Sequence, residues 1–137
     1  KKQIIKLLKD YDFKYPSLIH PSVFIQNDNI SIGKGCIICA NTIITCDISI
    51  GEFVTLNLSC TVGHDSKIES FSSFMPSVNV SGEVIVDEGV YVGTGAKIIN
   101  QLRIGKYSII GAGAVVSKSV EKNSLAVGVP AKVIRKL

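Results

Sequence analysis

Apolar side chains recur at every sixth position between residues 32 and 116. All fifteen places hold an aliphatic residue or phenylalanine: Ile32, Ile38, Ile44, Ile50, Leu56, Val62, Ile68, Phe74, Val80, Val86, Val92, Ile98, Ile104, Ile110 and Val116. A second row, of smaller or apolar residues, lies two positions earlier: Cys36, Thr42, Ile48, Val54, Cys60, Ser66, Ser72, Val78, Val84, Val90, Ala96, Ser108 and Ala114. A period of six differs from that of an α-helix and persists too long for a hairpin, so it indicates a stacked repeat.

The repeat predicts an all-β fold, a parallel β-helix over residues 15–121. Each hexapeptide supplies one short strand and one corner, and three hexapeptides make a triangular coil. Residues 18 apart in the sequence then lie above one another, at the strand spacing of about 4.8 Å. A single hexapeptide cannot bury its apolar residue alone, so we expect each coil to be stabilised by its neighbours.

The first coil departs from this regularity. Residues 15–31 keep the six-residue phase only in part, because His20 and Gln26 stand where aliphatic residues are expected. We expect Leu18, Phe24 and Ile30 to continue the inward row of smaller residues.

Both ends of the chain lie outside the repeat. Residues 1–14 place Ile4, Leu7, Leu8 and Tyr11 at helical spacing, which predicts a short amphipathic helix. Its apolar side either packs on an upstream domain or covers the open end of the β-helix. Since the chain starts at lysine rather than methionine, we expect a fragment or a processed protein. Residues 122–137 predict a tail with a turn followed by an extended or helical end.

Composition and charge narrow the function. With 46% apolar and 19% charged residues, the chain is typical of one globular domain. Ten of its fifteen basic residues precede residue 15 or follow residue 117. The middle is therefore mildly acidic and unsuited to nucleic acid. The sequence shows neither a signal peptide nor a membrane-spanning run, so we expect a cytoplasmic protein that binds no membrane.

The four cysteines do not predict a metal site. Cys36 and Cys39 have CxxC spacing, but no second CxxC or histidine pair accompanies them. Cys36 and Cys60 fall in the inward row of smaller residues, where a thiol packs as a small hydrophobic group. We expect thiols in a reducing compartment and no bound metal.

The repeat resembles that of the hexapeptide family of left-handed β-helix acetyltransferases. Residues 61–68, TVGHDSKI, narrow the resemblance to the sialic-acid O-acetyltransferases and nucleotide-activated aminosugar N-acetyltransferases, and residues 17–22, SLIHPS, are similar to the domain junction of that group. The resemblance implies a left-handed coil, although parallel crossovers generally favour the opposite hand. It also implies that residues 1–14 are the last helix of an upstream nucleotide-sugar-binding domain.

The same resemblance implies a catalytic centre at His64. Acyl transfer from a thioester needs a base, and a neutral imidazole suits that task. Asp65 either orients the ring or is simply a solvated acid, because adjacent strand residues point apart unless the corner bends the chain. Gly82, one coil above, corresponds to the oxyanion donor of the family, although a corner glycine chosen for its dihedral angles is an equal alternative.

Acetyl-CoA is the acyl donor that the resemblance implies. Two runs of small residues lie 18 positions apart and should stack into a bare groove for the pantetheine arm: Gly93, Thr94, Gly95 and Ala96, then Gly111, Ala112, Gly113 and Ala114. Three cations near the C-terminus are candidates for binding the phosphates: Lys118, Lys132 and Arg135. The expected acceptor is a small sugar carrying an amine or hydroxyl.

Relatives in the family form trimers with active sites between neighbouring prisms, so the resemblance implies a homotrimer.

A zinc carbonic anhydrase on the same fold is excluded, because it needs three histidines and this chain has two. A non-catalytic β-helix scaffold is the main alternative. An ice-binding surface is disfavoured, because the outer positions form no threonine ladder. Cys46, stacked below His64, is an alternative nucleophile for an acyl-enzyme route.

Overall fold

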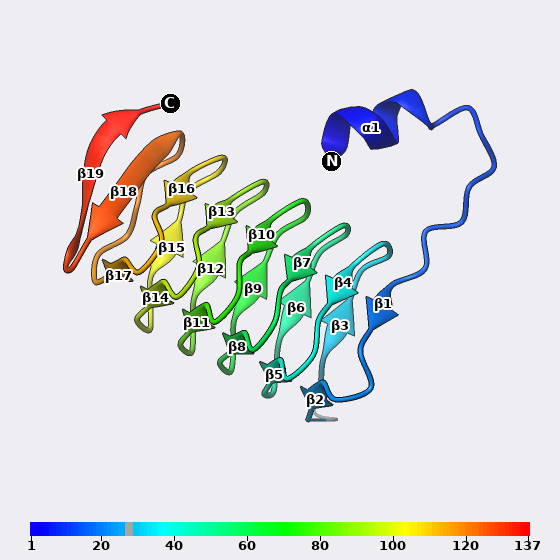
Figure 1. Cartoon of the computed structure of the whole chain (residues 1–137), viewed down its shortest axis with the longest axis horizontal. Coiled ribbons are helices and arrows are strands. Elements are labelled where there is room, and N and C mark those ends of the chain that lie inside the picture. The colour runs from blue at the N-terminus through cyan, green and yellow to red at the C-terminus, as the bar shows by residue number, and fades with distance from the viewer. Residues whose placement is uncertain (27–28) are drawn as a thin grey trace.

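The computed structural model describes residues 1–26 and 29–137 and confirms the parallel β-helix. Figure 1 shows its strands in three rows, which are the three faces of the prism. Sheet A consists of β1 (Leu18–Ile19), β4 (Ile37–Ile38), β7 (Thr55–Leu56), β10 (Ser73–Phe74), β13 (Tyr91–Val92), β16 (Ile109–Ile110), β18 (Ser124–Gly128) and β19 (Ala131–Lys136). Sheet B consists of β2 (Phe24–Ile25), β5 (Ile43–Ile44), β8 (Thr61–Val62), β11 (Asn79–Val80), β14 (Lys97–Ile98) and β17 (Val115–Val116). Sheet C consists of β3 (Ser31–Ile32), β6 (Ser49–Ile50), β9 (Lys67–Ile68), β12 (Ile85–Val86) and β15 (Arg103–Ile104).

The strand register confirms the predicted vertical stacking. In sheet A, Ser73 of β10 lies between Thr55 of β7 and Tyr91 of β13, and Asn79 of β11 lies between Thr61 and Lys97 in sheet B. Each step is 18 residues, so every residue at a corner has a counterpart one coil above and one below. The left-handed sense of the coil stays a prediction from the family resemblance.

The core holds the two rows that the sequence predicts. Fourteen of the fifteen periodic residues are buried, from Ile38 at 1% exposure to Val116 at 1%, and Ile32 packs against them partly buried. The row of smaller residues is buried throughout. Because isoleucine and valine fill thirteen of the fifteen places in the first row, stiff side chains stack in register along the inside of the prism.

Five of the six residues with a hydroxyl or thiol in the row of smaller residues bond the carbonyl of the residue 15 positions on, in the next coil, and the sixth, Ser108, bonds the Glu121 carbonyl 13 positions on. Five side chains donate this bond: Cys36 to Gly51, Thr42 to Asn57, Cys60 to Met75, Ser66 to Ser81 and Ser72 to Asp87, at 3.1 to 3.3 Å. We call these the corner bonds. They satisfy carbonyls at the coil corners that a purely apolar core would leave unpaired.

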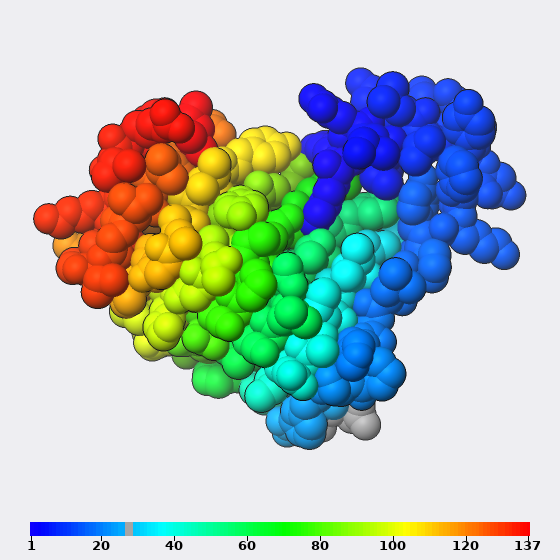
Figure 2. All heavy atoms as spheres, in the orientation of Figure 1, coloured from blue at the N-terminus to red at the C-terminus, as the bar shows by residue number. Residues whose placement is uncertain are grey.

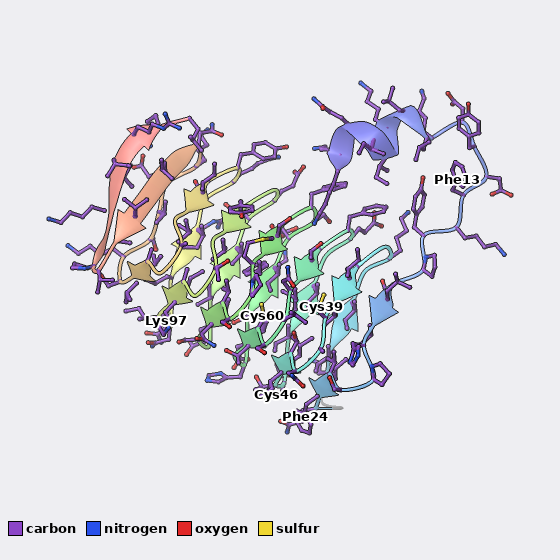
Figure 3. The ribbon with its side chains drawn as sticks, viewed as in Figure 1. Phe13, Phe24, Cys39, Cys46, Cys60 and Lys97 are labelled. Carbon is purple, nitrogen blue, oxygen red and sulfur yellow. The ribbon has the colours of Figure 1, made fainter. Side chains whose placement is uncertain are left out.

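The first coil differs from the sequence prediction by one residue. Leu18 pairs with Ile37 and Phe24 with Ile43, steps of 19 rather than 18. Leu18 and Phe24 therefore face outward, at 62% and 59% exposure, and Figure 3 shows Phe24 pointing away from the coils. The prediction that they lie in the inward row is therefore wrong. One extra residue before β3 shifts the register of β1 and β2 by one residue relative to the coil above. Because successive side chains of a strand point to opposite faces, this shift turns Leu18 and Phe24 outward. Ile30 does pack against the core. Residues 27–28, part of the predicted β-helix domain, lie outside the described residues.

The N-terminal helix α1 (Lys2–Leu7) is shorter than residues 1–14 and has no buried residue. It lies beside the coils rather than across the open end at β1, and Figure 2 shows the first residues, in blue, against the middle of the prism. The Lys1 ammonium donates to the carbonyls of Phe53 and Ser72 and to the hydroxyl of Thr55. The assignment of this helix to an upstream domain stays a prediction.

Glu88 anchors the N-terminal residues to the prism. Its carboxylate accepts hydrogen bonds from Lys106, Lys2 and the Tyr107 hydroxyl. These donors, that of Lys106 above all, lower the pKa of Glu88 from 4.5 to about 2. The carboxylate thus contributes stability above about pH 4.5, and this contribution is lost as the pH falls through about 2.

We therefore expect Glu88→Gln to lower the melting temperature at neutral pH. The difference from wild type should shrink as the pH falls below 4.5 and vanish below about 2. Thermal unfolding across this range measures it, with Glu52→Gln as control, since the Glu52 carboxylate has one lysine partner, at 3.6 Å. A difference between Glu88→Gln and wild type that does not change with pH would contradict this assignment.

The tail confirms the predicted turn and extended end. Strand β18 extends sheet A parallel to β16, and β19 returns antiparallel to β18. Gly128, the last residue of β18, has a φ of +100°, and the Val129–Pro130 peptide bond between the two strands is cis. The hairpin covers the last coil, whose open edge would otherwise expose unpaired backbone groups.

Candidate active site

Two corners border sheet B. The BC corner joins its strands to those of sheet C and carries Cys46, His64 and Gly82 in successive coils, above one another. The AB corner joins sheet A to sheet B and carries Thr94 and Gly95, with Ala112 and Gly113 in the next coil. The predicted base and the predicted groove for CoA therefore lie along opposite edges of one sheet.

His64 presents its imidazole to solvent at the BC corner. The ring nitrogen Nδ1 lies 2.8 Å from Oδ2 of Asp65. This contact between neighbouring residues is possible because Asp65 has a φ of 56°, in the left-handed region, which bends the chain at the corner. With Nδ1 bound to a carboxylate, the neutral ring carries its proton on Nδ1 and leaves Nε2 as the acceptor.

The imidazole of His64 rests against Gly82, in the space that a Cβ atom would occupy; we call this contact surface the seat of the imidazole. A Cβ atom at position 82 would lie 2.5 Å from Nε2 and 2.6 Å from Cε1 of His64. Only glycine therefore admits the ring in this position. Its φ is not in the left-handed region, so the need for glycine comes from this close approach. The Gly82 N–H donates to no backbone carbonyl of residues 1–26 and 29–137, which leaves it able to donate to an oxyanion.

Cys46 lies one coil below His64, where Figure 3 labels it near β5. Its carbonyl accepts a hydrogen bond from the Asp65 N–H at 3.2 Å.

The four cysteines of the described chain form no disulfide. Burial raises the pKa of the Cys36 and Cys60 thiols, which suits packed side chains rather than thiolate ligands. Among the described residues, no three His, Cys, Asp or Glu side chains gather to hold a metal ion.

The two glycine runs stack as predicted, because the Gly113 N–H donates to the Thr94 carbonyl at 2.8 Å. They do not form a uniformly bare groove. A Cβ at Gly93 would lie 2.5 Å from the Ala112 nitrogen, and one at Gly111 would lie 2.7 Å from Cγ1 of Val127. The space beside both glycines is therefore filled by the next layer of the chain. Only Gly95 and Gly113 face open space, since a Cβ atom added to either would have no neighbour within 4 Å among the described residues.

The three predicted phosphate-binding cations are exposed but lie apart. Lys118 follows β17, in the same corner column as His64 and Gly82, two coils above Gly82. Lys132 and Arg135 lie on β19, opposite Val127 and Leu125. None of the three makes an ion pair with another residue that the structure describes. Lys132 pairs with Val127, whose side chain covers Gly111. Of the three cations it is therefore the best placed to reach a ligand beside the glycine runs.

Comparisons with known proteins agree with this architecture. No family model matches the chain. A putative acetyltransferase of Schizosaccharomyces pombe is 32% identical over 130 residues, 89% of this chain and 60% of that protein. The fold superimposes with a TM-score of 0.94 on a mutant of perosamine N-acetyltransferase from Caulobacter crescentus in complex with CoA and GDP-perosamine, at 30% identity over 98% of this chain and 64% of the other. The chain belongs to the hexapeptide-repeat β-helix acetyltransferase family.

A second solved member of this hexapeptide-repeat family is the acetyltransferase domain of PglB from Neisseria gonorrhoeae in complex with acetyl coenzyme A. It superimposes with a TM-score of 0.92 at 29% identity over 97% of this chain and 64% of that chain. The present chain thus spans about 60% of the length of these relatives. No helix within the described residues is both long and apolar enough to cross a membrane.

Sequence reasoning missed two features of this site. It treated Gly82 as a backbone donor or a corner residue, whereas the glycine is required by the His64 ring. It also treated Ser66 only as a small core residue, whereas its hydroxyl bonds the turn that carries Gly82. The signal for the second was present in the row itself, because serine, threonine and cysteine recur there among aliphatic residues.

Proposed function

We propose that this protein transfers an acetyl group from acetyl-CoA to the amino group of a nucleotide-linked sugar, with His64 as the general base. The observation that carries the proposal is the seated imidazole, with Nδ1 held by Asp65 at 2.8 Å and Nε2 lying beside Gly82, 2.5 Å from the place a Cβ would take there. The relatives bound to CoA, acetyl-CoA and GDP-perosamine support the same donor and an aminosugar acceptor.

In the proposed reaction, the acceptor amine attacks the thioester carbonyl as Nε2 of His64 removes a proton from it. Asp65 holds the ring in the tautomer that leaves Nε2 unprotonated and stabilises the imidazolium that forms. The Gly82 N–H donates to the oxyanion of the tetrahedral intermediate. The C–S bond then breaks, and the departing thiolate of CoA takes up the proton, which gives an amide and free CoA. This route needs no acyl-enzyme at Cys46.

Acetyl-CoA fits the AB corner better than any other part of the late coils. Gly95 and Gly113 have open space over them, and Thr94, Ala112 and Gly113 are exposed. A slender pantetheine arm needs such a surface without side chains. Lys132 and Arg135 on the hairpin are the proposed partners of the phosphates, and Lys118 lies on the His64 corner instead.

The positions of the two corners support a homotrimer. His64 and Gly95 border opposite edges of sheet B in one protomer, so the base of that protomer cannot meet its own groove across the sheet. In a closed ring of copies, the BC corner of one meets the AB corner of the next. Sheet B then faces the neighbouring copies, and its outer residues Phe24 and Ile43, 59% and 43% exposed, become buried.

Mixing two inactive variants tests this arrangement. We expect His64→Ala and Gly113→Trp each to be inactive as pure proteins, because one lacks the base and the other fills the groove. Reassembled together, they should recover activity, up to about a quarter to a third of wild type, because some interfaces combine an intact BC corner with an intact AB corner. Light scattering should give the mass of three chains. A monomer, or no recovery in verified mixed oligomers, would contradict the shared site.

The function itself is tested by following CoA release from acetyl-CoA with a panel of acceptors. The panel contains nucleotide-linked aminosugars, sialic acid, galactosides and serine, and mass spectrometry identifies the acetylated product. We expect turnover with an aminosugar and loss of that turnover in His64→Ala. Acetyl-CoA that causes neither turnover nor a thermal shift would favour the non-catalytic scaffold instead.

A further inference from the structure

We propose that Ser66 is a positioning residue for the acetyl transfer, because its hydroxyl holds the turn that seats the His64 imidazole. This inference deepens the function proposed above and rests on it. Ser66 is 2% exposed and touches neither proposed substrate. Its effect would pass through Gly82.

The Ser66 hydroxyl bonds both ends of the turn at residues 81–84. Its Oγ donates to the Ser81 carbonyl at 3.1 Å and accepts from the Val84 N–H at 3.2 Å. Between these two residues lie Gly82 and Glu83. The turn that carries the seat is thus bonded at its first and last residues to one buried atom in the coil below.

The same turn is also bonded to His64 itself. The Glu83 N–H donates to the His64 carbonyl at 2.7 Å, and the Ser66 Oγ lies 3.4 Å from that carbonyl. The backbone of the base and the backbone of its seat are therefore joined on two sides. A hydroxyl hydrogen can serve one acceptor at a time, and the shorter contact assigns it to Ser81.

The fit above this turn has little tolerance. The ring lies so close to Gly82 that a single Cβ would meet Nε2 at 2.5 Å. Removing the hydroxyl leaves the Ser81 carbonyl and the Val84 N–H without their partner in a buried place, so the turn must move to find others. A shift of a few tenths of an ångström there changes where the imidazole rests, and catalytic rates are sensitive to displacements on this scale.

The chain contains its own controls for this proposal. Ser72 makes the same corner bond, to the Asp87 carbonyl at 3.1 Å, where sheet C joins sheet A and away from His64. Ser72→Ala therefore removes a corner bond without touching the seat. Cys36 and Cys60 make corner bonds through thiols, at 3.1 and 3.3 Å. Ser66→Cys therefore keeps a donor of a kind that the fold already uses.

The experiment compares Ser66→Ala, Ser66→Cys and Ser72→Ala with wild type, at a temperature where thermal scans show all four to be folded. Steady-state kinetics use acetyl-CoA and the acceptor identified with the panel. NMR follows the ring resonances of His64, assigned by their absence in His64→Ala. We expect Ser66→Ala to lower kcat about tenfold or more and to shift the His64 resonances, with the KM for acetyl-CoA unchanged. Ser66→Cys should restore both, and Ser72→Ala should lose melting temperature but keep kcat within about twofold and leave the resonances in place.

Two outcomes would overturn the proposal. One is an equal loss of kcat in Ser66→Ala and Ser72→Ala, which would show a general effect of stability. The other is a Ser66→Ala protein with unmoved His64 resonances. If wild type acetylates no acceptor, the proposed function fails, while the resonances still decide whether Ser66 holds the ring.

Discussion

His64→Ala is expected to lower kcat by about 10² to 10⁴ while leaving the β-helix folded. The imidazole supplies a base whose Nδ1 is held by Asp65 and whose Nε2 lies beside Gly82. Its side chain is 56% exposed, so its removal leaves no cavity in the core. Binding of acetyl-CoA should persist, because the groove proposed for it is formed at Gly95 and Gly113 and not by the His64 side chain.

The measurement is CoA release under saturating acetyl-CoA, with His20→Ala as the matched control. His20 is also exposed, and its Nδ1 accepts a hydrogen bond from the Ser22 N–H at 3.1 Å, but it lies in the first coil, at the AB corner after β1 and not at the BC corner of His64. We expect His20→Ala to keep kcat close to wild type. A His64→Ala protein with wild-type kcat would remove His64 from the mechanism, and a Cys46→Ala protein without activity would favour the acyl-enzyme alternative.

Gly82→Ala is expected to lower kcat by about 10² or more, although it adds a single methyl group. The new Cβ would lie 2.5 Å from Nε2 of His64, so the imidazole must leave its seat. The corner itself should survive, because the clash is with an exposed side chain rather than with backbone. At Gly63, by contrast, a Cβ would meet the Gly82 nitrogen at 2.6 Å, so Gly63→Ala should chiefly destabilise the fold.

A double-mutant cycle separates this mechanism from a general distortion. If Gly82→Ala acts by displacing the imidazole, it should have almost no further effect on kcat in a His64→Ala background. Melting temperatures of the single variants provide the stability comparison. Independent, multiplying losses of kcat would indicate instead that Gly82 contributes mainly as an oxyanion donor, since that role does not pass through the ring.

The fold was predictable because a hexapeptide repeat leaves little choice of architecture. The apolar positions 32 to 116 determine which side chains point inward, and the structure buries or partly buries all of them. The first coil was not predictable in detail. Leu18 and Phe24 are apolar at the expected spacing, yet they face outward because one extra residue precedes β3, and a shift of one reverses every side chain of a strand.

The site was predictable in its residues more than in its contacts. His64, Gly82 and the two glycine runs follow from the 18-residue stacking, which the register confirms. The filling of the space beside Gly111 by Val127 could not be foreseen, because the tail lies outside the repeat and folds back as a hairpin. The pairing of Asp65 with His64 depended on a left-handed φ, which recurs at every sixth residue from 29 to 113, mostly at residues other than glycine. The corner geometry of the repeat imposes this φ, and the pattern of apolar residues alone did not reveal it.

By itself, the sequence determined the coil, its period and the order of residues along each corner, because burial of the same two positions in every six requires a stacked column. Tertiary structure alone decided which glycines are open and which are covered, and where the imidazole rests. It also showed that the base and the groove for CoA occupy opposite edges of sheet B. The physical reason is that periodicity specifies direction, inward or outward, whereas fit at a corner depends on distances of a few tenths of an ångström between coils.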